Sequence, residues 1–134
     1  MSIVALIRCE SYDYDEVKKA VICGLGLIGG AEKFLKNGKN VILKPNLLVG
    51  ELPEKCVNTH HTVFRAVAEI FKETGARLSY GDSPAIGSTS SAARRCGIQV
   101  IAQELGIAEA DFKLPWKCFT KKACRIRNFL SQRR

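Results

Sequence analysis

The chain of 134 residues has no apolar run as long as the roughly 18 to 20 residues that a membrane-spanning helix needs. Its start, Met1-Ser2-Ile3-Val4, lacks the basic segment and the cleavage pattern of a secretory signal peptide. None of the six cysteines stands in a C-x-x-C arrangement, and metal-ligand spacing is absent. We therefore expect a cytoplasmic protein with reduced, mostly buried thiols and no metal site.

Acidic residues are missing from the last 22 positions of the chain. Residues 113–134 hold eight basic side chains and no acid, whereas residues 1–112 hold 13 basic and 13 acidic side chains. The net charge of +8 therefore belongs to the tail and carries no information about a site elsewhere. We divide the chain into an α/β domain over residues 1–112 and a basic tail over residues 113–134.

Short apolar runs alternate with longer amphipathic patterns along residues 1–112. The runs are typical of buried strands and lie at residues 3–7, 41–43 and 78–81. Apolar residues at helical spacing predict helices over residues 15–35, from a cap at Asn58 or Thr59 to Gly75, and over residues 88–105. The order β-α-β-α-β-α predicts a three-layer α/β fold with a mainly parallel sheet of three to four strands.

Polar side chains cluster where the second and third strands end and where the second helix begins. The carboxyl ends of parallel strands border a crevice lined by helix N-termini, which is where α/β proteins bind ligands. The clustered residues are Lys44, Asn46, Thr59, His60, Asp82 and Ser83. They predict a site for an anionic or metal-bridged small molecule, with no reaction assigned to it.

These residues also have ordinary structural roles. Lys44 either binds a carboxylate or phosphate as a point charge or is a solvated lysine near a turn. Asp82 holds a cation, accepts a substrate hydroxyl, or caps the next segment. Thr59 is expected mainly as a helix cap and His60 as a half-exposed imidazole, with ligand contact as the second role. Both interpretations stay open.

A glycine motif indicates a different function. Gly24, Gly26 and Gly29 match the G-x-G-x-x-G loop that holds the pyrophosphate of a dinucleotide at a helix N-terminus. The second strand, however, is followed by Lys44 rather than by the acidic residue that would bind the ribose. The competing interpretation is a glycine-interrupted helix over residues 15–35. An NAD(P)-dependent oxidoreductase is therefore the alternative function.

The joint order of several motifs resembles one prokaryotic family. The motifs are Asn40-Val-Ile-Leu-Lys-Pro-Asn-Leu-Leu, Pro53-Glu54-Lys55, Thr59-His60 and Gly81-Asp82-Ser83-Pro84. Over roughly residues 3–112 the chain resembles the family called domain of unknown function 362, whose longer members often carry a ferredoxin-like iron-sulfur segment. The resemblance implies no settled reaction, and it favours one long first helix over a glycine loop.

Three departures limit what this resemblance implies. His61 stands where a proline is usual, the later family motifs are missing, and there is no cysteine cluster. We therefore expect no iron-sulfur cluster, leave any other cofactor open, and expect no enzymatic activity of this chain alone. A missing second half would leave a sheet edge and apolar surface uncovered, so we expect self-association.

Two explanations of residues 113–134 stay open. A shifted reading frame or a truncation would produce a basic, acid-free stretch without a fold or function of its own. A working basic amphipathic helix is the other, because Phe119, Ala123, Ile126 and Leu130 fall on one helical face. Such a helix would make the chain an adaptor for nucleic acid or for an acidic membrane surface.

Overall fold

Three parallel strands lie side by side in the order β1-β2-β3 in a computed structural model that describes residues 3–35 and 39–110. Strand β1 (Asn40–Leu43) pairs with β2 (Arg77–Tyr80) along its whole length, with Leu43 opposite Tyr80 at the end. Strand β3 (Ala108–Glu109) pairs with the last two residues of β2. The predicted α/β fold with a parallel sheet of three strands is confirmed.

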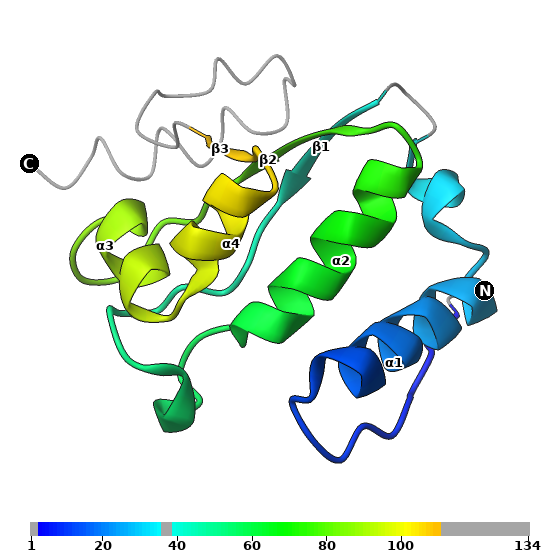
Figure 1. Ribbon diagram of the computed structural model, residues 1–134, viewed down its shortest axis with the longest axis horizontal. Helices are drawn as coiled ribbons and strands as arrows, with labels where there is room; N and C mark the ends of the chain where they lie inside the picture. Colours follow the sequence, from blue (N-terminus) through cyan, green and yellow to red (C-terminus); the bar gives the residue numbers. More distant parts are fainter. Residues whose placement is uncertain (1–2, 36–38, 111–134) are drawn as a thin grey trace, which may run out of the picture.

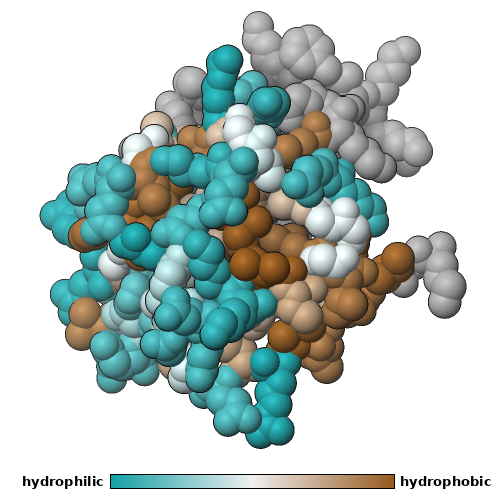
Figure 2. All heavy atoms as spheres, turned by 45° about the vertical axis from the view of Figure 1, so that its right-hand side comes forward, coloured by the Kyte–Doolittle hydropathy of each residue, from teal (hydrophilic) through white to brown (hydrophobic). Residues whose placement is uncertain are grey.

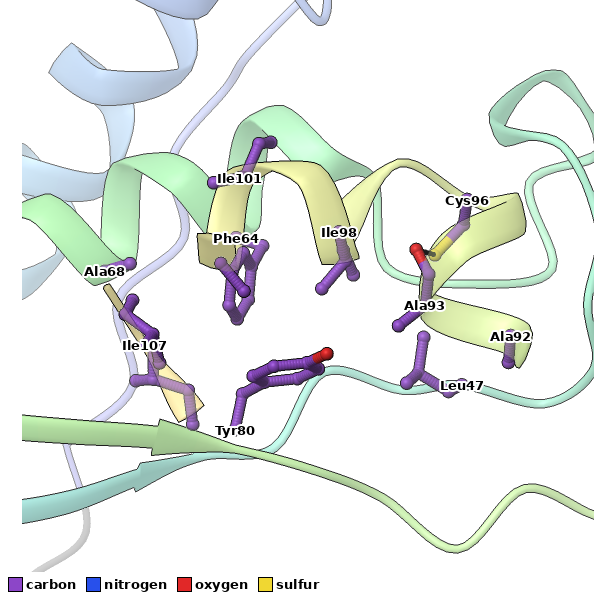
Figure 3. Packing of buried hydrophobic residues seen from close by; sticks show 12 residues of the cluster. Leu47, Phe64, Ala68, Tyr80, Ala92, Ala93, Cys96, Ile98, Ile101 and Ile107 are labelled. Atoms are coloured by element: carbon purple, nitrogen blue, oxygen red, sulfur yellow. Dashed lines mark hydrogen bonds between the residues drawn. The ribbon is translucent and has the colours of Figure 1, made fainter. Parts of the chain in front are cut away.

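The helices that connect the strands lie together on one face of this sheet. Helix α2 (His61–Glu73) joins β1 to β2, and helices α3 (Thr89–Arg95) and α4 (Ile98–Glu104) join β2 to β3. Because the strands follow one another across the sheet in chain order, right-handed crossovers place every connecting helix on the same side. Figure 3 shows this arrangement, with α2 and α4 above the strands and the apolar core between them.

Large apolar side chains from the helices and the sheet fill this core. Phe64 of α2 meets Tyr80 of β2 edge to face, with ring centroids 5.6 Å apart and an interplanar angle of 70°. Ile98 at the start of α4 is completely buried, and Leu47 of the loop after β1 is 1% exposed. The other buried members of the cluster are Leu43, Ala68, Ala92, Ala93, Cys96, Ile101, Ala102 and Ile107. Burial of this surface is the main source of stability for the domain.

Helix α1 (Tyr14–Leu27) packs along α2 rather than on the strands (Figure 1). Asp13 caps its N-terminus by accepting from the backbone N–H groups of Asp15 and Glu16. In Figure 3 this helix, in pale blue, lies on the side of α2 away from the sheet. The layers are therefore the sheet, α2 with α4, and α1.

The strand predicted at residues 3–7 is wrong for the described structure. These residues are extended without strand pairing, and Val4 and Leu6 are 88% and 95% exposed. They run beside α1, where a Cβ on Gly24 would lie 3.5 Å from Ile7. An apolar run becomes a strand only where a sheet edge supplies hydrogen-bond partners. The element order is therefore α-β-α-β-α-α-β instead of β-α-β-α-β-α.

The single helix predicted over residues 15–35 is also wrong, because α1 ends at Leu27. Gly29 and Gly30 follow with φ angles of +107° and +82°, which only glycine adopts at low cost, and a 3-10 helix, η1 (Ala31–Leu35), comes next. The closure predicted at residues 37–38 lies outside the described residues. Gly24 and Gly26 lie inside α1, so this geometry does not form the strand–loop–helix that a dinucleotide loop requires.

The third predicted helix is divided in two by Gly97. This glycine has a φ angle of +83° and separates α3 from α4 within the segment predicted as one helix over residues 88–105. The turn rotates the second helix relative to the first, so Val100, which the helical spacing placed inward, is 54% exposed. Gly106 ends α4 with a φ angle of +65°, as predicted.

Apolar side chains remain exposed on the side of the molecule that carries α1. Figure 2, which turns this side forward, shows hydrophobic residues gathered there. The exposed large apolar residues of this part of the chain are Ile3, Val4, Leu6, Ile22, Leu27 and Phe34. Contiguous apolar surface of this kind favours association. Self-association stays a prediction. Within the described ranges, no helix has the length and apolar content to cross a membrane.

Candidate functional site

Asp82 joins the two loops that leave the carboxyl ends of β1 and β2. It directly follows Gly81 at the end of β2 and is only 6% exposed. Its Oδ2 accepts a hydrogen bond of 2.8 Å from the backbone N–H of Leu47, and its Oδ1 lies 2.7 Å from Nζ of Lys44. A buried carboxylate needs such partners, because isolation from water otherwise costs several kcal/mol. Asp82 therefore fixes the β1 loop against the β2 loop.

The surroundings of Asp82 hold its carboxyl group in the ionised form. Burial raises the pKa of this group, but the Lys44 ammonium and the backbone N–H groups of Leu47 and Ser83 lower it by more, so the net pKa lies below its usual value. Hydrogen bonds to the charged form thus outweigh desolvation. The group is a carboxylate near neutral pH, and it is an acceptor only.

Lys44 reaches this carboxylate from the solvent side. Its side chain is 61% exposed, whereas the Asp82 side chain is 7% exposed. An ammonium has three donors, so one on Asp82 leaves two for water or for a ligand. Ser83 and Asn46 are exposed as well. The structure thus brings Lys44, Asp82 and Ser83 together at the neighbouring strand ends, as predicted.

Thr59 holds the loop after β1 instead of capping α2. Its Oγ1 accepts a hydrogen bond of 2.8 Å from the backbone N–H of Asn46, and its own N–H donates to the Asn46 carbonyl at 2.9 Å. Asn58 closes the same loop, because its side chain accepts from the Leu48 N–H and donates to the Val49 carbonyl. The predicted cap at Asn58 or Thr59 is therefore wrong. Both side chains are used within the loop.

His60 is the N-cap of α2. Its Nδ1 accepts from the backbone N–H of Thr62 at 3.3 Å and lies 2.8 Å from the Thr62 hydroxyl. The ring is stacked between Tyr12, at a centroid distance of 3.8 Å, and His61, at 4.3 Å. The His60 ring therefore contacts Tyr12 in the segment before α1, as well as His61 and Thr62 of α2. Lys44 and Asp82 contact each other at the strand ends.

A charged network between α1, α2 and α4 was not expected from the sequence. Glu69 of α2 accepts from the hydroxyl of Tyr14 and pairs with Lys18 at 2.9 Å, while Arg65 pairs with Glu104 of α4. Burial raises the pKa of Glu69, but its hydrogen bonds to Tyr14 and Lys18 lower the pKa by more, so the net pKa is below its usual value. The i,i+4 spacing of Arg65 and Glu69 was the available signal for one of these pairs.

A groove of about 560 Å³ runs beside this network. Its lining residues are Tyr14, His61, Thr62, Arg65, Glu69, Gly97, Val100, Ile101 and Glu104. The acids and bases on its wall are paired with one another, so they add little net charge to it. Across the part of the chain that the structure describes, no three His, Cys, Asp or Glu side chains are grouped to hold a metal ion.

Comparison with known proteins points to one family. Residues 41–122 match the family model described as Domain of unknown function (DUF362). Over 110 residues the chain is 36% identical to the "Thylakoid-associated protein sll1697" of Synechocystis sp. (strain ATCC 27184 / PCC 6803 / Kazusa), and the alignment covers 82% of this chain and 34% of that protein. The chain thus spans about a third of the length of this curated relative. No solved structure matches it.

Proposed function

Since the chain belongs to the domain of unknown function 362 family, we propose that it binds an anionic small molecule at the carboxyl ends of β1 and β2. The observation that carries the proposal is the asymmetric pair of an exposed Lys44 and a buried Asp82, 2.7 Å apart. The buried carboxylate holds the ammonium in one position, which reduces the entropy that Lys44 loses when it binds an anion. In the proposed site, Lys44, Asn46 and Ser83 contact the ligand and Asp82 positions Lys44.

The charge of Asp82 also limits this site. Because the carboxylate neutralises the ammonium, an anion gains little net Coulomb attraction, and binding relies on hydrogen bonds from the free donors. A divalent cation offers a second way to hold the same ligand, since it would replace Lys44 at Asp82 and bridge to the anion. Thr59 and His60 stay predicted contacts only, since the structure uses both in other interactions.

Lys44→Gln should weaken binding of inorganic phosphate about tenfold, because one hydrogen bond to a charged group is worth roughly 1.5 to 3 kcal/mol. Isothermal titration of the full chain with phosphate, with and without Mg²⁺, measures this change. Lys33→Gln is the matched control, since Lys33 on η1 is exposed and donates to the Ile28 carbonyl at the end of α1. Equal phosphate affinity of the Lys44→Gln variant and the wild type in both buffers would refute the proposal. If the wild-type chain binds phosphate more tightly when Mg²⁺ is present, the result would favour the metal-bridged form of the site.

The proposed role of this chain is binding alone, without a reaction at this site. The oxidoreductase alternative has no support from the geometry, because Gly24 and Gly26 lie within α1.

A second candidate function is attachment to an acidic membrane surface through residues 113–134. Two facts favour it: this tail holds eight basic residues and no acid, and the curated relative is named as thylakoid-associated. Each basic residue near an anionic surface contributes about 1 kcal/mol, and salt screens the attraction. Nucleic acid would also attract such a tail. The cytoplasmic location stays a prediction.

Deletion of residues 113–134 should abolish co-sedimentation of the chain with phosphatidylserine vesicles at low salt. Wild-type binding should also fall steeply between about 0.05 and 0.5 M salt, as a screened interaction does. Uncharged phosphatidylcholine vesicles are the control surface, and a duplex DNA is the competing ligand. Vesicle binding that survives the deletion would contradict a role for the tail. Binding to DNA alone would favour the nucleic-acid adaptor.

A further inference from the structure

Three aromatic rings form a continuous stack at the N-terminus of α2. Tyr12, from the segment before α1, lies on His60 with an interplanar angle of 13° and a centroid distance of 3.8 Å. His60 lies on His61 with an angle of 27° and a distance of 4.3 Å. Gly97, between α3 and α4, packs against His61, since a Cβ there would lie 3.4 Å from the His61 ring. Segments far apart in the sequence meet at these rings.

The cap of α2 requires an unprotonated Nδ1 on His60. This nitrogen accepts from the Thr62 N–H at 3.3 Å, and an imidazolium has no acceptor for that bond. A protonated Nδ1 would instead donate to the Thr62 hydroxyl, which lies 2.8 Å away, and the backbone cap would be lost. A positive charge at this point would also oppose the helix dipole, which is positive at the N-terminus. A cation–π contact with Tyr12 would return about 0.5 to 1 kcal/mol to the charged form, which is less than the cap and the dipole remove together. The next residue, His61, has a buried Nδ1 without a hydrogen-bond partner among the described residues.

We propose that Tyr12, His60 and His61 form a proton-sensitive clasp, which holds the segment before α1 against the start of α2 when His60 is neutral and releases it when His60 binds a proton. The proton enters at Nδ1 of His60, where it displaces the Thr62 N–H. Loss of the cap and of the stack then frees Tyr12. The clasp is separate from the Lys44 and Asp82 pair, so either proposal can fail alone.

The charged neighbours of His60 agree with this direction. The groups that face it are Tyr12 from the segment before α1, His61 from α2 and Glu54 from the 3-10 helix η2 (Pro53–Lys55). Burial lowers the pKa of His60, His61 lowers it further, and Glu54 opposes both, with a net decrease. A histidine with a lowered pKa in the closed form contributes stability that is complete above its ordinary pKa of about 6.5. That stability is lost as the pH falls through the lower, closed-form value.

The pKa of His60 in the full chain is the first test of the clasp. The chain has two histidines, so ¹³C NMR titration of their ring carbons gives two curves, and a His61→Asn variant assigns them. We expect His60 to titrate below about 6.5. Tyr12→Ala should raise this pKa towards the ordinary value by exposing the ring, whereas Tyr12→Phe, which keeps the ring, should leave it unchanged. A wild-type His60 that titrates at or above 6.5 would overturn the proposal.

Release of the segment is the second test. Trypsin cleavage after Arg8, followed by mass spectrometry and normalised to a free peptide of residues 3–12, should rise between pH 7.5 and 5. The cleavage rate should rise by up to about tenfold for each pH unit by which the pKa of His60 is lower in the closed form than in the released form. His60→Asn keeps a good cap that does not titrate, and it should remove this rise. An equal rise in the wild type and in His60→Asn would refute the clasp.

Discussion

Asp82→Ala should lower the free energy of unfolding by about 3 kcal/mol, because the backbone N–H of Leu47 then loses a charged acceptor in a site that water does not reach. Leu47 is 1% exposed and Asp82 is 6% exposed, so neither group regains solvent in the folded chain. Lys44 contributes little to this cost, since its side chain is 61% exposed and returns to water. Urea unfolding followed by circular dichroism measures the change.

Two controls separate the parts of this effect. Asp82→Asn keeps an acceptor for the Leu47 N–H and removes the charge, so it should cost clearly less than Asp82→Ala. Lys44→Met removes the ion pair alone and should cost below about 1 kcal/mol. Because the pKa of Asp82 is lowered in the folded state, its stabilisation is present above the ordinary value of about 3.9 and is lost as the pH falls through the folded-state value. An Asp82→Ala variant as stable as the wild type would show that the carboxylate does not hold the two loops together.

Phe64→Ala should cost about 4 kcal/mol, which is the largest effect we expect from a single substitution in this chain. Phe64 is 3% exposed and meets Tyr80, which is 2% exposed, edge to face across the core. Removal of the ring opens a cavity between α2 and β2, and the two elements cannot close it without moving the strand. The same urea unfolding experiment measures the loss, and the variant should also melt at lower temperature.

Phe34→Ala is the matched control for Phe64→Ala. Phe34 lies on η1, is 55% exposed and contacts Phe71 edge to face at a centroid distance of 6.3 Å. The same atoms are removed, but they leave water-exposed surface rather than a cavity, so the cost should stay below about 1 kcal/mol. Similar losses for both variants would contradict the assignment of the core to the space between α2 and the sheet.

Local chemistry was sufficient to predict several elements of this fold. The apolar run at residues 41–43 identified β1, because a buried parallel strand needs continuous apolar side chains. Gly75 and Gly106 marked the ends of α2 and α4, and their φ angles of +76° and +65° are ones that other residues avoid. Such signals depend on a few neighbouring residues, so they can be interpreted without the tertiary structure.

The candidate site was predictable in position but not in its contacts. Polar residues after adjacent parallel strands come together at one edge of a sheet, and Lys44 and Asp82 do so. The helix cap was predicted at Asn58 or Thr59, because hydroxyl and amide side chains are the common caps. The Thr59 hydroxyl instead accepts from the Asn46 N–H, which left His60 as the acceptor at the start of α2. The order of residues along the chain does not show which of two backbone N–H groups a polar side chain will bind.

The sequence by itself determined the family, the parallel α/β character, the helix ends at Gly75 and Gly106, and the gathering of polar groups at the strand ends. The tertiary structure alone decided that residues 3–7 lie along α1 without strand pairing, that Gly97 separates α3 from α4, and that Tyr12 stacks on His60. The physical reason is the range of the interactions. Propensity and periodicity act between neighbours, whereas strand pairing, ring stacking and the burial of Asp82 depend on partners that only the folded chain brings into contact.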